Sequence, residues 1–82
     1  MAENRVAVIA IIIENMQSVS AVNNILHDFS EFIIGRMGLP YRERKLSVIN
    51  IVLDAPMDKI NSLAGQLGRL DGVTAKAVCS TL

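Results

Sequence analysis

Basic and glycine residues gather between positions 35 and 45, which makes this stretch the richest in binding chemistry. Four of the eight Lys and Arg residues, the single tyrosine and two glycines fall within these eleven positions. An arginine guanidinium presents paired donors to a carboxylate or phosphate, and glycine lets a ligand approach the main-chain amides. The pattern predicts an anion-binding segment with the candidate contacts Gly35, Arg36, Gly38, Tyr41 and Arg42.

A structural role explains the same stretch without a ligand. Basic residues on the edge strand of a sheet discourage aggregation, and glycines permit a bulge or a turn. Glu43 lies inside the cluster and can neutralise part of its charge. An edge-protecting hairpin is the simpler interpretation, and the ligand site stays open beside it.

A metal site is a further hypothesis, built on His27 and Glu31, which stand four positions apart and can share one face of a helix. The sequence holds one histidine, so other ligands would have to come from Asp28, Cys79 or a second copy of the chain. A half-exposed histidine beside solvated acids explains the pattern better. We expect no metal and no other cofactor, with His27 as the weak metal candidate.

Catalysis finds little support in the sequence. A nucleophilic Cys79 or serine would need a base and an orienting group, and His27 is expected on a different element from Cys79. The acids that could pair for acid-base work each lie where a turn or helix start favours an acid. They are Glu14, Asp54, Asp58 and Asp71. Phosphate-loop, dinucleotide, zinc and dithiol motifs are absent, so the sequence predicts a protein that is not an enzyme.

The composition of the 82-residue chain points to a partner surface. Hydrophobic residues make up 51% of it and the mean hydropathy is +0.40, more apolar material than a thin two-layer core can hide. A second copy is the simplest cover, so we expect a homodimer or homotetramer. Eight basic and eight acidic residues cancel, which disfavours direct binding to nucleic acid.

Insertion into a membrane and secretion are also disfavoured. The longest apolar run, residues 6–13, is far shorter than the roughly 20 residues that a helix needs to cross a bilayer. The N-terminal residues lack the features of a secretory signal, and the single Cys79 cannot form an internal disulfide. We expect a cytoplasmic protein that does not bind membranes.

Hydrophobic periodicity predicts the elements that would position these groups. Residues 5–13 are rich in Val and Ile, which predicts a strand buried on both faces. From Val19 onward, apolar residues recur at steps of three and four, which predicts an amphipathic helix that Ser18 or Ser20 can cap. Residues 33–40 contain two glycines and end in a proline, which predicts a short, bent edge strand.

The second half of the chain repeats this order of elements. Residues 46–53 form a strand with two mostly apolar faces, of which the helices of this chain can cover one. Residues 54–56 are expected to begin a second helix, and residues 73–80 to return as the last strand. The order predicts an α+β, ferredoxin-like βαββαβ fold of one domain over residues 1–82. Its four-stranded antiparallel sheet would carry both helices on one face.

Three segments of the chain resemble a known family. Residues 33–42, residues 46–56 and residues 63–73 are similar to the iron-only hydrogenase system regulators, and the resemblance covers nearly the whole chain. That family is similar in fold to the ACT domain and to the ligand-binding half of the nickel-responsive regulator. The resemblance implies an ACT-like, ferredoxin-like domain that associates through its sheet and senses a small molecule where protomers meet.

The resemblance also implies a role in the regulation or maturation of iron-only hydrogenase. ACT domains often bind amino acids near the turn after the first strand, which here adds Glu14, Asn15 and Ser18 to the candidate contacts. An ordinary strand-to-helix connection explains these residues equally well. The chain shows no ribbon-helix-helix segment and lacks the set of metal-binding histidines of the nickel-responsive regulator. Direct DNA binding and nickel sensing are therefore not expected.

The leading hypothesis is a non-catalytic regulatory domain whose oligomer interface forms the ligand site, so that ligand shifts the oligomer between states. Its alternative is a structural or adaptor module without a small-molecule ligand. Such a module would dock another protein through its apolar sheet face or its edge strand.

Overall fold

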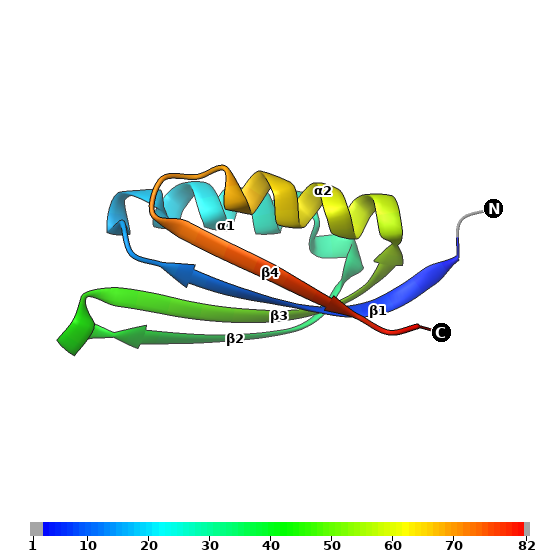
Figure 1. The fold of residues 1–82 in the computed structure, drawn as a ribbon, viewed down its shortest axis with the longest axis horizontal. Coiled ribbons are helices and arrows are strands. Elements are labelled where there is room, and N and C mark those ends of the chain that lie inside the picture. Colours follow the sequence, from blue (N-terminus) through cyan, green and yellow to red (C-terminus); the bar gives the residue numbers. More distant parts are fainter. Residues whose placement is uncertain (1–2, 82) are drawn as a thin grey trace.

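Two helices lie on one face of a four-stranded sheet in the computed structural model, which describes residues 3–81 (Figure 1). The strands are β1 (Asn4–Ile13), β2 (Ile33–Tyr41), β3 (Leu46–Pro56) and β4 (Val73–Cys79). The helices are α1 (Val19–Asp28) and α2 (Met57–Gly68), and short 3-10 turns span Met16–Ser18, Ser30–Phe32 and Arg42–Arg44. The ferredoxin-like α+β arrangement predicted from the sequence is confirmed. Met1, Ala2 and Leu82 of the expected 1–82 domain lie outside the described residues.

The strands follow the order β2-β3-β1-β4, and each neighbouring pair is antiparallel. β1 is central: its Ile9 stands opposite Ile51 of β3 on one side and Ala77 of β4 on the other. β2 is an edge strand, as predicted, but it spans nine residues and is not short. Figure 1 shows its hairpin with β3 reaching beyond the ends of the helices.

The core forms between one face of the sheet and the apolar stripes of both helices. Alternate residues of a strand point to opposite faces, so β1 and β3 each send every second side chain toward the helices. The fully buried large side chains come from both strands and both helices. They are Ile9, Ile11, Ile13, Val22, Leu26, Ile51, Leu53, Ile60, Leu63 and Leu67.

The expectation that β1 is buried on both faces is wrong for the single chain. Val6, Val8 and Ile12 point away from the helices and are 43%, 40% and 41% exposed. The reason is the number of layers, because both helices of the chain lie on the opposite face (Figure 1). The second apolar face of the sheet is therefore open to solvent in one copy of the chain.

The second helix begins later than the sequence suggests. Residues 54–56 were expected to start it, but they continue β3, where Asp54 stands opposite Val6 of β1. Pro56 has extended backbone angles (φ −61°, ψ 152°) and directly precedes the first residue of α2. The fixed φ of proline suits a strand end as well as a first helical turn, so pairing with β1 decides between them. No helix within residues 3–81 has the length and apolar character needed to cross a membrane.

Two connections at one end of the sheet are joined by side-chain hydrogen bonds. The amide of Asn15, in the β1–α1 connection, donates to the carboxylate of Asp71 at 2.6 Å. The hydroxyl of Ser18 donates to the backbone carbonyl of the same Asp71, also at 2.6 Å. Ser18 occupies the N-cap position of α1, as predicted, but its side chain makes no capping hydrogen bond to the helix, and Ser20 lies inside the helix. These bonds tie the start of α1 to the α2–β4 turn.

Gly72 lies at the closest point of these two connections. Its carbonyl accepts a hydrogen bond from the amide of Glu14 at 2.7 Å, and its φ of +67° is a conformation that side chains disfavour. A Cβ atom at this position would lie 2.5 Å from the Cβ of Asn15. Backbone conformation and close packing both require glycine here.

Replacing Gly72 by alanine should lower the free energy of unfolding by about 1–3 kcal/mol, because the positive φ and the contact with Asn15 both become strained. Gly68→Ala is the matched control, since nothing lies within 4 Å of a Cβ there and alanine favours the helix end. Urea unfolding of both variants measures the difference. Equal stability of the two would contradict the close approach at Gly72.

Candidate functional site

The open face of the sheet is apolar over all four strands. We define it by the side chains that the register places opposite the helix-facing ones, and its large exposed members reach 72% exposure at Val78. They are Val6, Val8, Ile12, Met37, Leu39, Tyr41 and Val78. Solitary exposed hydrophobic residues are common on protein surfaces, whereas a contiguous apolar patch is a candidate interaction surface.

A single amide interrupts the middle of this open face. The register places Asn50 of β3 between Met37 of β2 and Ala10 of β1, with Lys76 of β4 next in the same row. Asn50 is half-buried by the side chains of its own chain. Its amide offers both donors and an acceptor to whatever lies on this face.

A bulge decides which way the basic side chain of β2 points. Ile33 stands opposite Leu53, but the next aligned pair is Gly35 with Val52, so Ile34 is an extra residue in the strand. The shift sets Arg36 opposite the buried Ile51, on the helix side of the sheet. In a regular ladder Arg36 would have fallen on the open face, because side chains alternate with a period of two.

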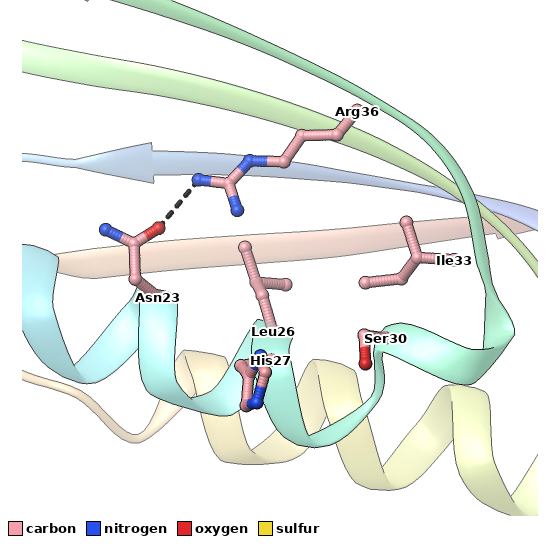
Figure 2. Close-up of a pocket in the computed structure, with 6 residues that line it drawn as sticks. All are labelled: Asn23, Leu26, His27, Ser30, Ile33 and Arg36. Atoms are coloured by element: carbon pink, nitrogen blue, oxygen red, sulfur yellow. Dashed lines mark hydrogen bonds between the residues drawn. The ribbon is translucent and has the colours of Figure 1, made fainter.

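Arg36 therefore enters a pocket between the edge strand and the first helix. This α1–β2 pocket has a volume of about 430 Å³. It is lined by Asn23, Leu26, His27, Ser30, Ile33 and Arg36. Figure 2 shows the Arg36 side chain lying over α1, where its Nη2 donates to Oδ1 of Asn23 at 2.6 Å. In the same view His27 and Ser30 lie beyond Leu26, on the far side from the guanidinium.

A second hollow lies at the end of the β2–β3 hairpin. This turn groove has a volume of about 480 Å³ and is lined by Met16, Pro40, Arg42, Lys45 and Leu46. Met16 belongs to the β1–α1 connection and the other lining residues to the basic segment or its end, so two stretches singled out in the sequence meet here. Two cationic side chains beside apolar ones can hold an anion that also has an apolar part.

The candidate contacts of the basic segment do not form one site. Arg36 lines the α1–β2 pocket, whereas Arg42 lines the turn groove. Gly38 faces the helix side opposite Ile49. Gly35 and Tyr41 face the open side, because the register aligns them with Val52 and Leu46.

The candidate contacts after β1 are largely engaged within the chain. Asn15 uses its side-chain amide on Asp71 and its side-chain oxygen on the backbone amide of Gln17. Ser18 is buried and its hydroxyl is hydrogen-bonded, while the Glu14 side chain is exposed. The hydrogen bonds favour the structural interpretation for Asn15 and Ser18.

The weak metal candidate has no cluster of ligands around it. Within residues 3–81, no group of three or more His, Cys, Asp or Glu side chains could hold a metal ion. His27 lines the α1–β2 pocket, and the half-buried Cys79 packs against the core from β4.

Several residues of the two hollows were not identified from the sequence. Asn23 and Ser30 occupy polar positions that look like a solvated helix surface, and Met16 looks like an isolated apolar residue in a turn. No local signal marks them, because their role depends on the approach of β2. Lys45 stands out in the sequence only as part of the charge cluster, and its φ of +55° places it in the left-handed region at the end of the turn.

The fold and its hollows define a small ferredoxin-like α+β protein with one open apolar sheet face and two hollows, each lined by apolar side chains and at least one basic side chain. The family comparison is consistent with that description. The chain belongs to the TM1266-like family, described as "Iron-only hydrogenase system regulator, putative", whose model matches residues 5–77. The family resemblance seen in the sequence is confirmed.

A solved structure supports the same assignment. The uncharacterized protein TM1266 from Thermotoga maritima is 37% identical, with a TM-score of 0.90 over 94% of this chain and 98% of that chain. A formyltetrahydrofolate deformylase from Pseudomonas putida KT2440 is 11% identical, with a TM-score of 0.65 over 89% of this chain and 28% of the deformylase. The likeness to the deformylase concerns the fold alone. A comparison with curated proteins gives no significant match.

Replacing Asn15 by alanine should lower the free energy of unfolding by about 1–2 kcal/mol, because the bonds to Asp71 and Gln17 are both lost. Arg42→Ala should change it by at most about 0.5 kcal/mol, since this side chain is exposed and makes no hydrogen bond within residues 3–81. Urea unfolding compares the two. An Asn15→Ala protein as stable as the parent would return Asn15 to the ligand candidates.

Proposed function

We propose that this protein is a non-catalytic regulatory module of the iron-only hydrogenase system that works as a homodimer or homotetramer and senses a small molecule. The connection with hydrogenase rests on the description of its family. The observation that carries the proposal of self-association is the open apolar face of the sheet. Burial of that face against a second copy removes apolar surface from water, which is the main favourable term in association.

A second copy of the chain fits the open face better than an unrelated surface. Asn50 lies in the middle row of that face, and a two-fold axis passing nearby would bring the two Asn50 amides together. Each amide can then donate to the other and accept from it, so the buried Asn50 of one protomer is hydrogen-bonded to the Asn50 of the second protomer. Asp54 and Lys76, which lie on the same face, carry opposite charges and suit the same self-complementary arrangement.

The turn groove is the proposed sensing site. Its wall includes Leu46, which the register places beside Tyr41 at the margin of the open face. A ligand held by Arg42 and Lys45 would therefore touch the proposed interface. Differential binding to two arrangements of the oligomer is what a ligand needs to shift their populations.

The proposed module neither catalyses a reaction nor binds nucleic acid directly. The chain lacks the common catalytic motifs, and its family is described as a regulator. His27 and Ser30 line the same pocket, but no hydrogen bond joins them. A catalytic base and its nucleophile lie within hydrogen-bonding distance of each other. A formal net charge of zero supports the absence of direct nucleic-acid binding.

An adaptor without a small-molecule ligand is the second candidate function. The edge strand β2 favours it, because its Ile34 is 67% exposed beside an unpaired strand edge. An extended segment of another protein could add to this edge as a further strand.

Val8→Glu should convert the oligomer into a monomer, because Val8 lies between Val52 and Val78 in the middle of the open face and a buried unpaired charge is costly. Asn24→Glu, on the exposed surface of α1, is the control that keeps the oligomer. Light scattering over a concentration series measures the mass, and circular dichroism checks the fold. A parent protein that is monomeric throughout would overturn the proposed self-association.

A thermal-shift screen with amino acids, nucleotides and metal ions separates sensing from the adaptor role. A ligand that binds only the folded state must raise the melting temperature. We expect an anionic compound to do so, and Arg42→Ala to reduce its effect because Arg42 lines the turn groove. No shift with any compound would favour the adaptor.

A further inference from the structure

The α1–β2 pocket exists because β2 offers little to fill the space beneath α1. Arg36 and Gly38 occupy two successive helix-facing positions of β2, opposite Ile51 and Ile49. An aliphatic pair at these positions would extend the core to the edge of the sheet. A Cβ atom built on Gly38 meets nothing within 4 Å, so the space beside Arg36 is open.

The bulge at Ile34 is the feature that aims Arg36 into this space. Bulges re-aim side chains and are frequent next to functional sites. The Arg36 guanidinium carries five N–H donors, of which the structure engages Nη2 with Asn23. It forms no ion pair with a carboxylate within residues 3–81. Nε and Nη1 therefore remain available to an incoming anion.

The lining of the pocket restricts the anion that fits. Among its residues Arg36 alone carries a permanent charge, which matches one negative charge better than the two of a phosphate monoester. Leu26 and Ile33 supply an apolar floor, which favours a ligand with a hydrocarbon body over a bare inorganic ion. The volume of about 430 Å³ lies within the range of small-molecule pockets.

We propose that the α1–β2 pocket binds a small organic monocarboxylate, with Arg36 on the carboxylate and Leu26 and Ile33 against its hydrocarbon part. Asn23 holds the guanidinium in place at the mouth of the pocket. The inference rests on the ligand sensing proposed above and adds a second site, on the opposite face of the sheet from the proposed oligomer interface.

The same inward arginine has a purely structural explanation. An inward-pointing charge on an edge strand deters pairing with another sheet and needs no ligand. The two explanations differ in what the pocket does when carboxylate is added. A ligand site must discriminate between a carboxylate and an uncharged molecule of equal shape, whereas edge protection predicts no binding at all.

Titration of the ¹⁵N-labelled protein with butyrate, followed by NMR, tests the proposal, and butyramide and inorganic phosphate serve as comparison probes. Butyrate should shift the resonances of Asn23, His27 and Arg36, and butyramide should not. Arg36→Gln should weaken butyrate binding roughly tenfold or more, because a charge-assisted hydrogen bond is lost. Lys59→Gln, which removes a positive charge from the exposed surface of α2 and alters neither hollow, should bind butyrate like the parent.

The proposal would be overturned if Arg36→Gln bound butyrate as tightly as the parent, or if butyramide or phosphate bound as tightly as butyrate. It would also be overturned if butyrate shifted none of these resonances. Arg36 is exposed, so its replacement should leave the fold intact, and the dispersion of the spectrum checks this directly. Solution mass, measured on the same samples, keeps the two proposals apart. An oligomer that ignores butyrate overturns the carboxylate site alone, whereas a monomer that binds butyrate through Arg36 overturns the proposed self-association alone.

Discussion

A sheet that is apolar on both faces, but covered by helices on only one, is the constraint on which the rest of this structure depends. The chain makes four strands and two helices from 82 residues, and both helices lie on the same face. Val and Ile occupy the inward and the outward positions of β1 alike, so no choice of face could bury them all. The hydrophobic effect would favour cover of the open face by a second protein surface, and the proposed cover is a second copy, which Asn50 in the middle row suits.

The helices cease to cover the sheet at the edge strand β2, and polar side chains can therefore lie there. A central strand must fill the space beneath the helices with apolar side chains, whereas an edge strand can place polar groups at the rim of the core. One extra residue, Ile34, turns Arg36 to the helix side, while Arg42 remains at the hairpin end. A basic segment that is continuous in the sequence is thereby divided between two separate hollows.

Hydrogen bonding explains why the turn after β1 is rich in polar residues. Asn15 and Ser18 both bond to Asp71, which lies more than 50 positions further along the chain. The same polar side chains that suggest a ligand in the sequence form hydrogen bonds between two connections of the fold. Gly72 also packs closely against Asn15 and accepts a hydrogen bond from Glu14. These contacts fix the two connections to each other at the end of the sheet next to the turn groove.

The sequence by itself determined the order of the elements, the amphipathic character of α1, and the two faces of β3, because these follow from local periods of 3.6 and 2. It also pointed to the surplus of apolar surface and, through residues 33–42, 46–56 and 63–73, to the family. Only the tertiary structure decided that residues 54–56 continue β3, since their pairing partners lie in β1. It likewise decided the direction of Arg36 and the engagement of Asn15 with Asp71. A strand register and a contact between distant turns depend on where other segments of the chain lie, and no local pattern records that.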